Sequence, residues 1–188
     1  MNRSHLVASA RAARLLPLRE DHLDDVLAIE EEAAPAGWSR NVFLAELARP
    51  ESRCYLVLEV PSAGVVAFGG MQLQVDEAHI ATLAVAAAHR RRKLATRLLI
   101  ALLREARARG AHAATLEVRL HNVAAQRLYA GVGFRPVGVR PRYYQGSVDA
   151  LIMWAHDIDG PEFGRMLDTL AADIADGAAA PGRPQRER

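Results

Sequence analysis

The sequence of 188 residues has few of the features that mark secreted, membrane or metal-dependent proteins. Its single cysteine, Cys54, excludes an internal disulfide and favours a reducing, cytoplasmic location. That cysteine lies in the apolar run 54–58, which is typical of core filling rather than of a nucleophile. The longest apolar runs, such as 82–88, fall far short of the ~20 residues that cross a bilayer. We therefore expect no membrane segment and no membrane partner.

Aromatic residues and lysine are also scarce. Aromatic side chains make up 5% of the sequence, which leaves few candidates for stacking on nucleic-acid bases. The net charge of +2 is too small to indicate nucleic-acid binding, although the run 90–93 is entirely basic and holds the only lysine, Lys93. His79, His89 and His121 lack the spacing of metal ligands. We expect neither a metal nor direct contact with nucleic acid.

The apolar pattern predicts one mixed α/β domain over 14–158, with the elements in the order β, α, α, β, β, β, α, β, α, β, β. We expect a flexible leader over 1–13, an appended amphipathic helix over 159–176 that packs on its own domain, and a disordered tail over 177–188. The strands are expected at 15–18, 53–60, 65–75, 79–85, 113–119, 134–139 and 148–155, and the helices from 20, from Ser39 as N-cap, over 94–110 and over 122–132.

A basic turn lies between the strand at 79–85 and the helix that begins at Leu94. Four positive charges there repel one another, because the helix macrodipole already contributes roughly half a positive charge. An anion relieves this repulsion, since free N–H groups and arginine side chains can both bind phosphate oxygens. The turn therefore indicates a pyrophosphate site, with a solvated arginine face as the alternative.

Glu117 lies in the otherwise apolar strand 113–118, where a carboxylate is costly unless it has a partner or a purpose. Two interpretations are open at this point. It can be a general base, or it can be a strand-end glutamate paired with Arg119 or another surface arginine. Asn122 follows the strand and is placed to cap the next helix.

Several segments together resemble a known family. They are Leu83-Ala84-Val85, Arg90-Arg91-Arg92-Lys93-Leu94-Ala95, Leu116-Glu117-Val118-Arg119, Asn122, Leu128-Tyr129 and Gly133-Phe134. In this order and at these spacings they resemble the core of the GCN5-related N-acetyltransferase (GNAT) superfamily, over the span from about Leu15 to Trp154. The L-E-V-R, N-x-x-A-x-x-L-Y and R-x-x-Y-Y elements are most similar to those of bacterial ribosomal-protein-alanine N-acetyltransferases. The resemblance implies the GNAT fold, a mixed and mostly antiparallel sheet of about seven strands flanked by helices.

The resemblance also implies acetyl-CoA as cosubstrate and direct acetyl transfer, without a covalent acyl-enzyme. Leu83, Ala84 and Val85 would bind the pantetheine arm through backbone groups, and Asn122 would contact the cosubstrate as well. The pyrophosphate would be held by Arg90, Arg91, Arg92, Lys93, Leu94, Ala95 and Thr96. The family turn is R/Q-x-x-G-x-G/A, and Lys93 occupies the position of its first glycine, whereas Ala95 fits the second.

The same resemblance assigns the proton transfers. Glu117 would be the base, Tyr129 would protonate the departing thiolate, and the Val85 N–H would stabilise the oxyanion. A protein α-amine has a pKa of ~7.7–8.0, so a modest base can complete its deprotonation.

The predicted acceptor is the N-terminal amine of a protein. The resemblance to ribosomal-protein-alanine N-acetyltransferases implies that this protein is a ribosomal one. Trp38 and Ser39 would line one side of the peptide groove, and Tyr143 and Tyr144 would face them. The enzymatic alternative is a GNAT protein that acetylates a lysine side chain or a small amine. The non-catalytic alternatives are a ribosome- or RNA-binding module and a scaffold without cosubstrate, the latter suggested by Lys93.

Overall fold

The computed structural model of the chain describes residues 13–34 and 37–177, so residues 1–12 of the leader expected over 1–13 and residues 178–188 of the tail expected over 177–188 lie outside the described residues. The strands are β1 (Arg14–Pro17), β2 (Arg53–Val60), β3 (Gly64–Gln74), β4 (Glu77–Val85), β5 (Ala113–Arg119), β6 (Arg135–Tyr144) and β7 (Val148–Ala155). The helices are α2 (Leu23–Ala33), α3 (Arg40–Leu47), α4 (Leu94–Ala108), α5 (Val123–Ala130) and α6 (Pro161–Gly177), with 3-10 turns η1 (Glu20–His22) and η2 (Ala87–His89).

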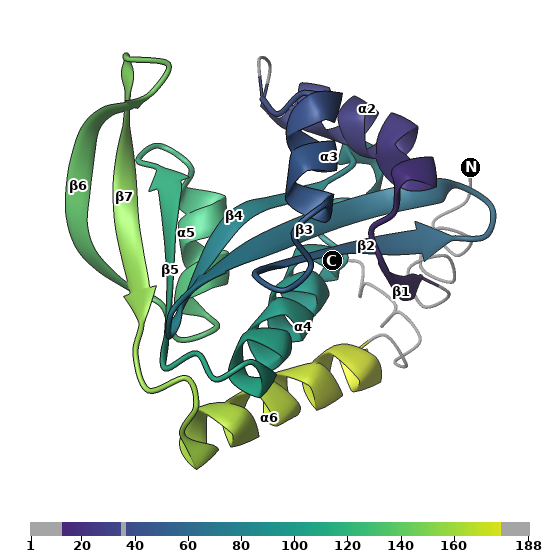
Figure 1. Cartoon of the computed structure of the whole chain (residues 1–188). Coiled ribbons are helices and arrows are strands. Elements are labelled where there is room, and N and C mark those ends of the chain that lie inside the picture. Colours follow the sequence, from purple (N-terminus) through teal and green to yellow (C-terminus); the bar gives the residue numbers. More distant parts are fainter. Residues whose placement is uncertain (1–12, 35–36, 178–188) are drawn as a thin grey trace, which may run out of the picture.

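One seven-stranded sheet in the order β1-β2-β3-β4-β5-β7-β6 runs through the domain (Figure 1). Every neighbouring pair is antiparallel except β4 and β5, which confirms the predicted mixed, mostly antiparallel sheet. The central position of β4 agrees with its apolar character on both faces. The parallel pairing of β4 with β5 covers only three residue pairs and ends at His79 opposite Thr115. Beyond that pair the two strands diverge, and the sheet opens into a cleft.

Helices cover both faces of the sheet. On one face, α2 and α3 bury Leu23, Val26 and Phe43 against β2, β3 and β4. On the other face, α4, α5 and α6 pack against the sheet, with Leu99 and Leu102 of the α4 stripe fully buried. Burying one such leucine stabilises the fold by about 1.5–3 kcal/mol. The apolar stripes read from the sequence therefore form the hydrophobic cores on the two faces of the sheet.

The C-terminal helix α6 packs on its own domain against α4, as expected (Figure 1). Its Leu167 is fully buried, and the Arg104 guanidinium contacts the Asp168 carboxylate at 2.6 Å. The Arg107 guanidinium donates to the carbonyl oxygens of Ile158 and Gly160, which fixes the chain where it enters the helix. Ala13, the last residue of the expected leader, is also buried.

The predicted boundaries differ from the structure at several elements. The first helix begins at Glu20 as predicted, where the 3-10 turn η1 leads directly into α2. α5 ends at Ala130 rather than at residue 132, because the chain closes a tight turn in which the Val132 N–H donates to Tyr129. β6 continues to Tyr144, beyond the predicted strand end at residue 139. An irregularity there is absorbed at Arg142, which has φ of 50° and donates its N–H to Asp149 Oδ1 at 2.8 Å.

Candidate active site

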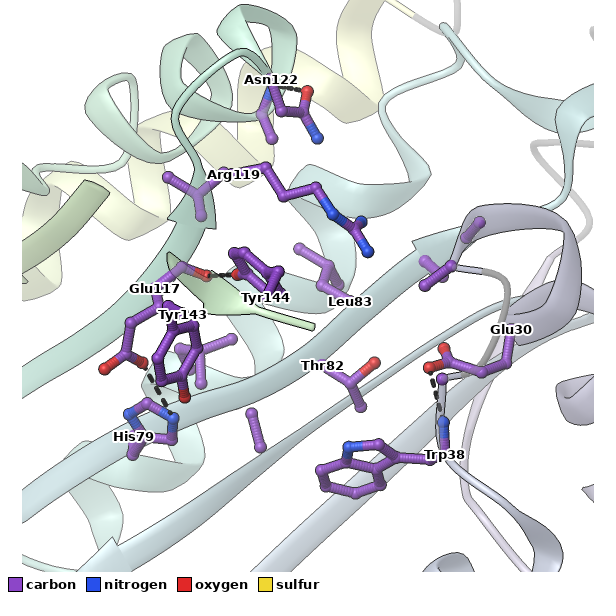
Figure 2. A pocket seen from close by; sticks show the side chains of 18 of the residues that line it. Glu30, Trp38, His79, Thr82, Leu83, Glu117, Arg119, Asn122, Tyr143 and Tyr144 are labelled. Atoms are coloured by element: carbon purple, nitrogen blue, oxygen red, sulfur yellow. Dashed lines mark hydrogen bonds and ion pairs between the residues drawn. The ribbon is translucent and has the colours of Figure 1, made fainter. Parts of the chain in front are cut away.

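A cavity of about 650 Å³ lies where β4 and β5 diverge (Figure 2). Side chains from α2, β4, β5, α5 and β6 and from the loop between α2 and α3 line it. Eight of the predicted site residues are among them: Trp38, Leu83, Ala84, Glu117, Asn122, Tyr129, Tyr143 and Tyr144. The predicted residues outside its lining are Ser39, Val85 and the turn Arg90, Arg91, Arg92, Lys93, Leu94, Ala95 and Thr96. The cleft thus brings together the residues of the proton transfers and of the groove, whereas the basic turn lies apart from the cavity.

Glu117 is held on both carboxylate oxygens. Its Oε1 lies 3.0 Å from Arg140 Nη1, and its Oε2 lies 3.4 Å from His79 Nε2 (Figure 2). Its side chain is only 10% exposed, so these contacts compensate much of the cost of burying the charge. The arginine that pairs with Glu117 is Arg140 on β6. Arg119, which lies on β5 with Glu117, contacts the ring of Tyr144 instead. Glu117 is therefore both an ion-paired glutamate and a residue of the cavity wall.

Tyr129 on α5 and Tyr144 on β6 both form part of the cavity wall. Tyr129 on α5 is buried, and burial raises the pKa of its phenol well above the usual range. The Tyr144 hydroxyl donates to the Glu117 carbonyl oxygen at 2.9 Å, and burial raises the pKa of Tyr144 to about 12. The Arg119 guanidinium lies 4.8 Å from the centre of the Tyr144 ring. Both phenols stay protonated at neutral pH, so each can donate a proton or a hydrogen bond.

Trp38 forms the facing side of the cavity (Figure 2). Its ring packs on Phe43 and Tyr55, with centroid distances of 5.4 and 6.1 Å, so it serves packing as well as the cavity wall. Its backbone N–H donates to Glu30 Oε1 at 3.1 Å. Burial raises the pKa of Glu30, although the Trp38 hydrogen bond and the charge of Arg119 act in the opposite direction.

Ser39 and Asn122 were both expected to cap helices. Ser39 occupies the N-cap of α3, but its side chain makes no capping hydrogen bond. Asn122 does cap α5, because its Oδ1 accepts the Ala125 N–H at 3.1 Å. Its amide also lines the cavity, so the capping bond leaves it in reach of a ligand.

The backbone of the basic turn has the left-handed conformation that usually requires glycine, although Lys93 occupies the position. Lys93 is the N-cap of α4 in the left-handed conformation, with φ of 60° and ψ of 13°, and Arg91 has φ of 62°. No side chain caps the N-terminus of α4, so its first N–H groups are available to phosphate oxygens. Arg90 contacts Glu32 at 3.6 Å, and Arg92 donates to the Ala88 carbonyl oxygen at 2.8 Å. The turn therefore fits a pyrophosphate, with two of its arginines already holding the loop.

Three ionisable residues of the cavity lining were not predicted as site residues: His79, Glu30 and Arg119. From the sequence, His79 was considered only as a metal ligand and Arg119 only as a partner for Glu117 and part of the L-E-V-R element, and Glu30 was given no role. His79 could have been recognised as a candidate from the sequence, because it is a lone histidine in an apolar strand. The other two were not recognisable without knowing which way their elements face.

The comparisons with known proteins agree with this geometry. The model of the acetyltransferase (GNAT) family matches residues 23–134. The ribosomal protein bS18-alanine N-acetyltransferase of Haemophilus ducreyi is 34% identical over 126 residues, which cover 66% of this chain and 84% of that protein. The chain belongs to the GNAT acetyltransferase family. It is an N-acetyltransferase, and acetyl-CoA is its acetyl donor.

Two solved structures have a similar fold. The crystal structure of the ribosomal-protein-S18-alanine N-acetyltransferase from Escherichia coli has a TM-score of 0.69 at 30% identity and covers 77% of this chain and 94% of that one. Ard1 from Thermoplasma volcanium has a TM-score of 0.71 at 27% identity and covers 77% of this chain and 97% of that one. In the part of the chain that the structure describes, no helix is long and apolar enough to span a membrane, and no cluster of three potential metal ligands occurs.

Proposed function

We propose that this enzyme acetylates the N-terminal α-amine of a protein, and that the protein is a ribosomal one. The observation that carries the proposal is the cavity, where Glu117 and Tyr129 share a cleft flanked by Trp38 on one side and by Tyr143 and Tyr144 on the other (Figure 2). Aromatic walls of this kind suit an extended peptide end. The names of the relatives from Haemophilus ducreyi and Escherichia coli support the same acceptor.

Residues along the open edge of the cleft would hold acetyl-CoA. Leu83 and Ala84 pair with β3 but lie in the part of β4 beyond its pairing with β5, so the side of the strand toward β5 can pair with the pantetheine arm. The uncapped N-terminus of α4 and the basic turn suit the pyrophosphate. Asn122 lies within reach from α5. A cytoplasmic location, where ribosomal proteins are made, is part of the proposal and agrees with the lone cysteine.

The bound thioester supplies the acetyl group: a C–N bond forms at the amine, the C–S bond breaks, the amine loses a proton and the sulfur gains one. Tyr129 suits the second transfer because its buried phenol stays protonated and can give its proton to the sulfur. The amine's proton moves to the centre formed by Glu117 and His79. The Val85 N–H is the proposed donor to the carbonyl oxygen that becomes negative.

The ordinary acidities of amines favour an α-amine over a lysine as the acceptor. With pKa values of ~7.7–8.0 and ~10.4, roughly a third of α-amines but only about one lysine side chain in a thousand is neutral at pH 7.5. A centre built from a carboxylate and an imidazole provides a modest base. It suits the small deprotonation that an α-amine needs.

Initial rates on short peptides test this proposal. We expect acetylation of a peptide with a free α-amine and no lysine, and loss of activity when that amine is blocked. A peptide with a blocked α-amine and one internal lysine is the matched control and should react at least about 100-fold more slowly, in line with the neutral fractions. Activity that is unaffected by blocking the α-amine would overturn the proposal.

A further inference from the structure

His79 occupies the point where the cleft begins. It is the last residue of β4 that pairs with β5, and its register partner there is Thr115. The side chain is 26% exposed and lines the cavity beside Glu117 (Figure 2). The imidazole is thus held between a paired stretch of sheet, which fixes its backbone, and the open space in which an acceptor amine would lie.

The Glu117 carboxylate is a poor destination for the amine's proton. Its Oε1 is engaged by Arg140 Nη1 at 3.0 Å, and its Oε2 faces His79 Nε2 at 3.4 Å. Protonating either oxygen would weaken a contact with a cation or a donor, in a side chain that is only 10% exposed. The arrangement instead resembles a carboxylate that orients an imidazole.

Only one of the two imidazole nitrogens of His79, Nε2, faces Glu117. When the nitrogen that faces Glu117, Nε2, carries the proton of the neutral imidazole, the lone pair is on Nδ1, for which no hydrogen-bond partner occurs among residues 13–34 and 37–177. A histidine, with an ordinary pKa of ~6.5, lies close enough to an α-amine at ~7.7–8.0 for efficient proton transfer. Contacts of 3.4 Å commonly tighten once a substrate is bound.

We propose that His79 is a catalytic residue that accepts the proton of the acceptor amine at Nδ1, and that Glu117 is the positioning residue that sets its tautomer. This inference rests on the proposed N-terminal acetyltransferase function. As the C–N bond forms, the proton moves from the amine nitrogen to Nδ1, and the imidazolium is stabilised by the Glu117 carboxylate. The proton then leaves to solvent through the open side of the cavity, while Tyr129 supplies the proton for the sulfur.

Charged groups from two strands lie near the imidazole. The Glu117 carboxylate from β5 is beside it, and Arg140 from β6 contacts that carboxylate. The register partner of His79 on β3, Gln72, is neutral, and Glu30 and Arg119 line other parts of the same cavity. Because a general base must be unprotonated to accept the proton, the proposed role predicts an acid limb in the kcat/KM profile of the natural enzyme.

The experiment is a comparison of His79→Gln, Glu117→Gln and a control on a free α-amine peptide, with kcat, KM and pH profiles. For His79→Gln we expect kcat to fall about 10²–10⁴-fold with peptide KM and acetyl-CoA affinity within about threefold, and the histidine limb to disappear. Glu117→Gln should lower kcat less and keep that limb. The control is His156→Gln, an exposed histidine stacked on Trp154 outside the cavity lining, and it should behave as the natural enzyme.

A second variant separates chemistry from structure. His79→Ala leaves a space beside Glu117, and added imidazole should restore a concentration-dependent part of kcat. Failure of this rescue in a variant that still binds acetyl-CoA, or a His79→Gln variant with more than a third of the natural kcat, overturns the inference while the proposed function stands. A natural enzyme that binds acetyl-CoA but does not acetylate the free α-amine refutes the proposed function, and the inference falls with it.

Discussion

Replacing Lys93 by glycine tests whether the basic turn keeps a glycine conformation at the expense of stability. Lys93 has φ of 60° and ψ of 13°, the left-handed region that costs a residue with a Cβ roughly 1–2 kcal/mol. Glycine avoids this cost but loses about 0.5–1 kcal/mol through the greater freedom of the unfolded chain. We therefore expect Lys93→Gly to stabilise the fold by about 0.5–1 kcal/mol, which raises Tm by about 1–4 °C.

The assay is thermal unfolding followed by calorimetry, with Lys93→Ala as matched control. Alanine removes the same charge but keeps the Cβ, so it should leave Tm within about 1 °C of the natural value, since the left-handed cost stays. An equal rise in both variants would show that relief of charge repulsion, not backbone strain, limits the turn. A fall in Tm for Lys93→Gly would refute the reasoning outright.

The same variants report on acetyl-CoA. Because the backbone of the natural turn already has the glycine conformation, we expect micromolar binding by the natural enzyme in titration calorimetry. Lys93→Gly should change the affinity by less than about fivefold, the size of one exposed charge contact near a helix terminus. If only the glycine variant binds, the lysine side chain blocks the site, and the scaffold interpretation is favoured.

Three further predictions follow from the cavity and its supports. Tyr129→Phe should lower kcat about 10²-fold or more at unchanged acetyl-CoA affinity, measured by steady-state rates and calorimetry, and a loss below threefold would exclude the phenol as the proton donor. Gly37→Ala should cost about 1–3 kcal/mol in urea unfolding, because a Cβ there would overlap Glu30 Oε1 and approach the Ala34 carbonyl at 2.8 Å, whereas Gly138→Ala, where a Cβ would meet only Ile152 Cδ1 at 4.0 Å, should be neutral. Burial raises the pKa of Cys54 to about 11, so little thiolate exists at pH 8, and alkylation by iodoacetamide should run far slower than for a free thiol; equal rates would contradict this burial.

The local patterns of the sequence were sufficient for most of the fold. The stripe of leucines in α4 and the alternating or fully apolar runs of β2, β5 and β7 placed these elements correctly, because periodicity reports which face of an element is buried. Motif spacing also identified the family, since its cofactor turn and its L-E-V-R and L-Y elements each need fixed residues at fixed positions. Boundaries failed where backbone irregularities decide them, as at Arg142 in β6.

What only the tertiary structure decided is which side chains meet in the cleft. His79 and Glu117 are 38 positions apart in sequence and come together because β4 and β5 pair for just three residues and then diverge. Arg140 reaches the same carboxylate from the edge strand β6, across β7, which lies between β5 and β6 in the sheet (Figure 1). Such contacts depend on strand order and register, which local periodicity does not encode. The sequence by itself determined the fold and the class of reaction, and the packing of distant strands decided which groups surround the glutamate.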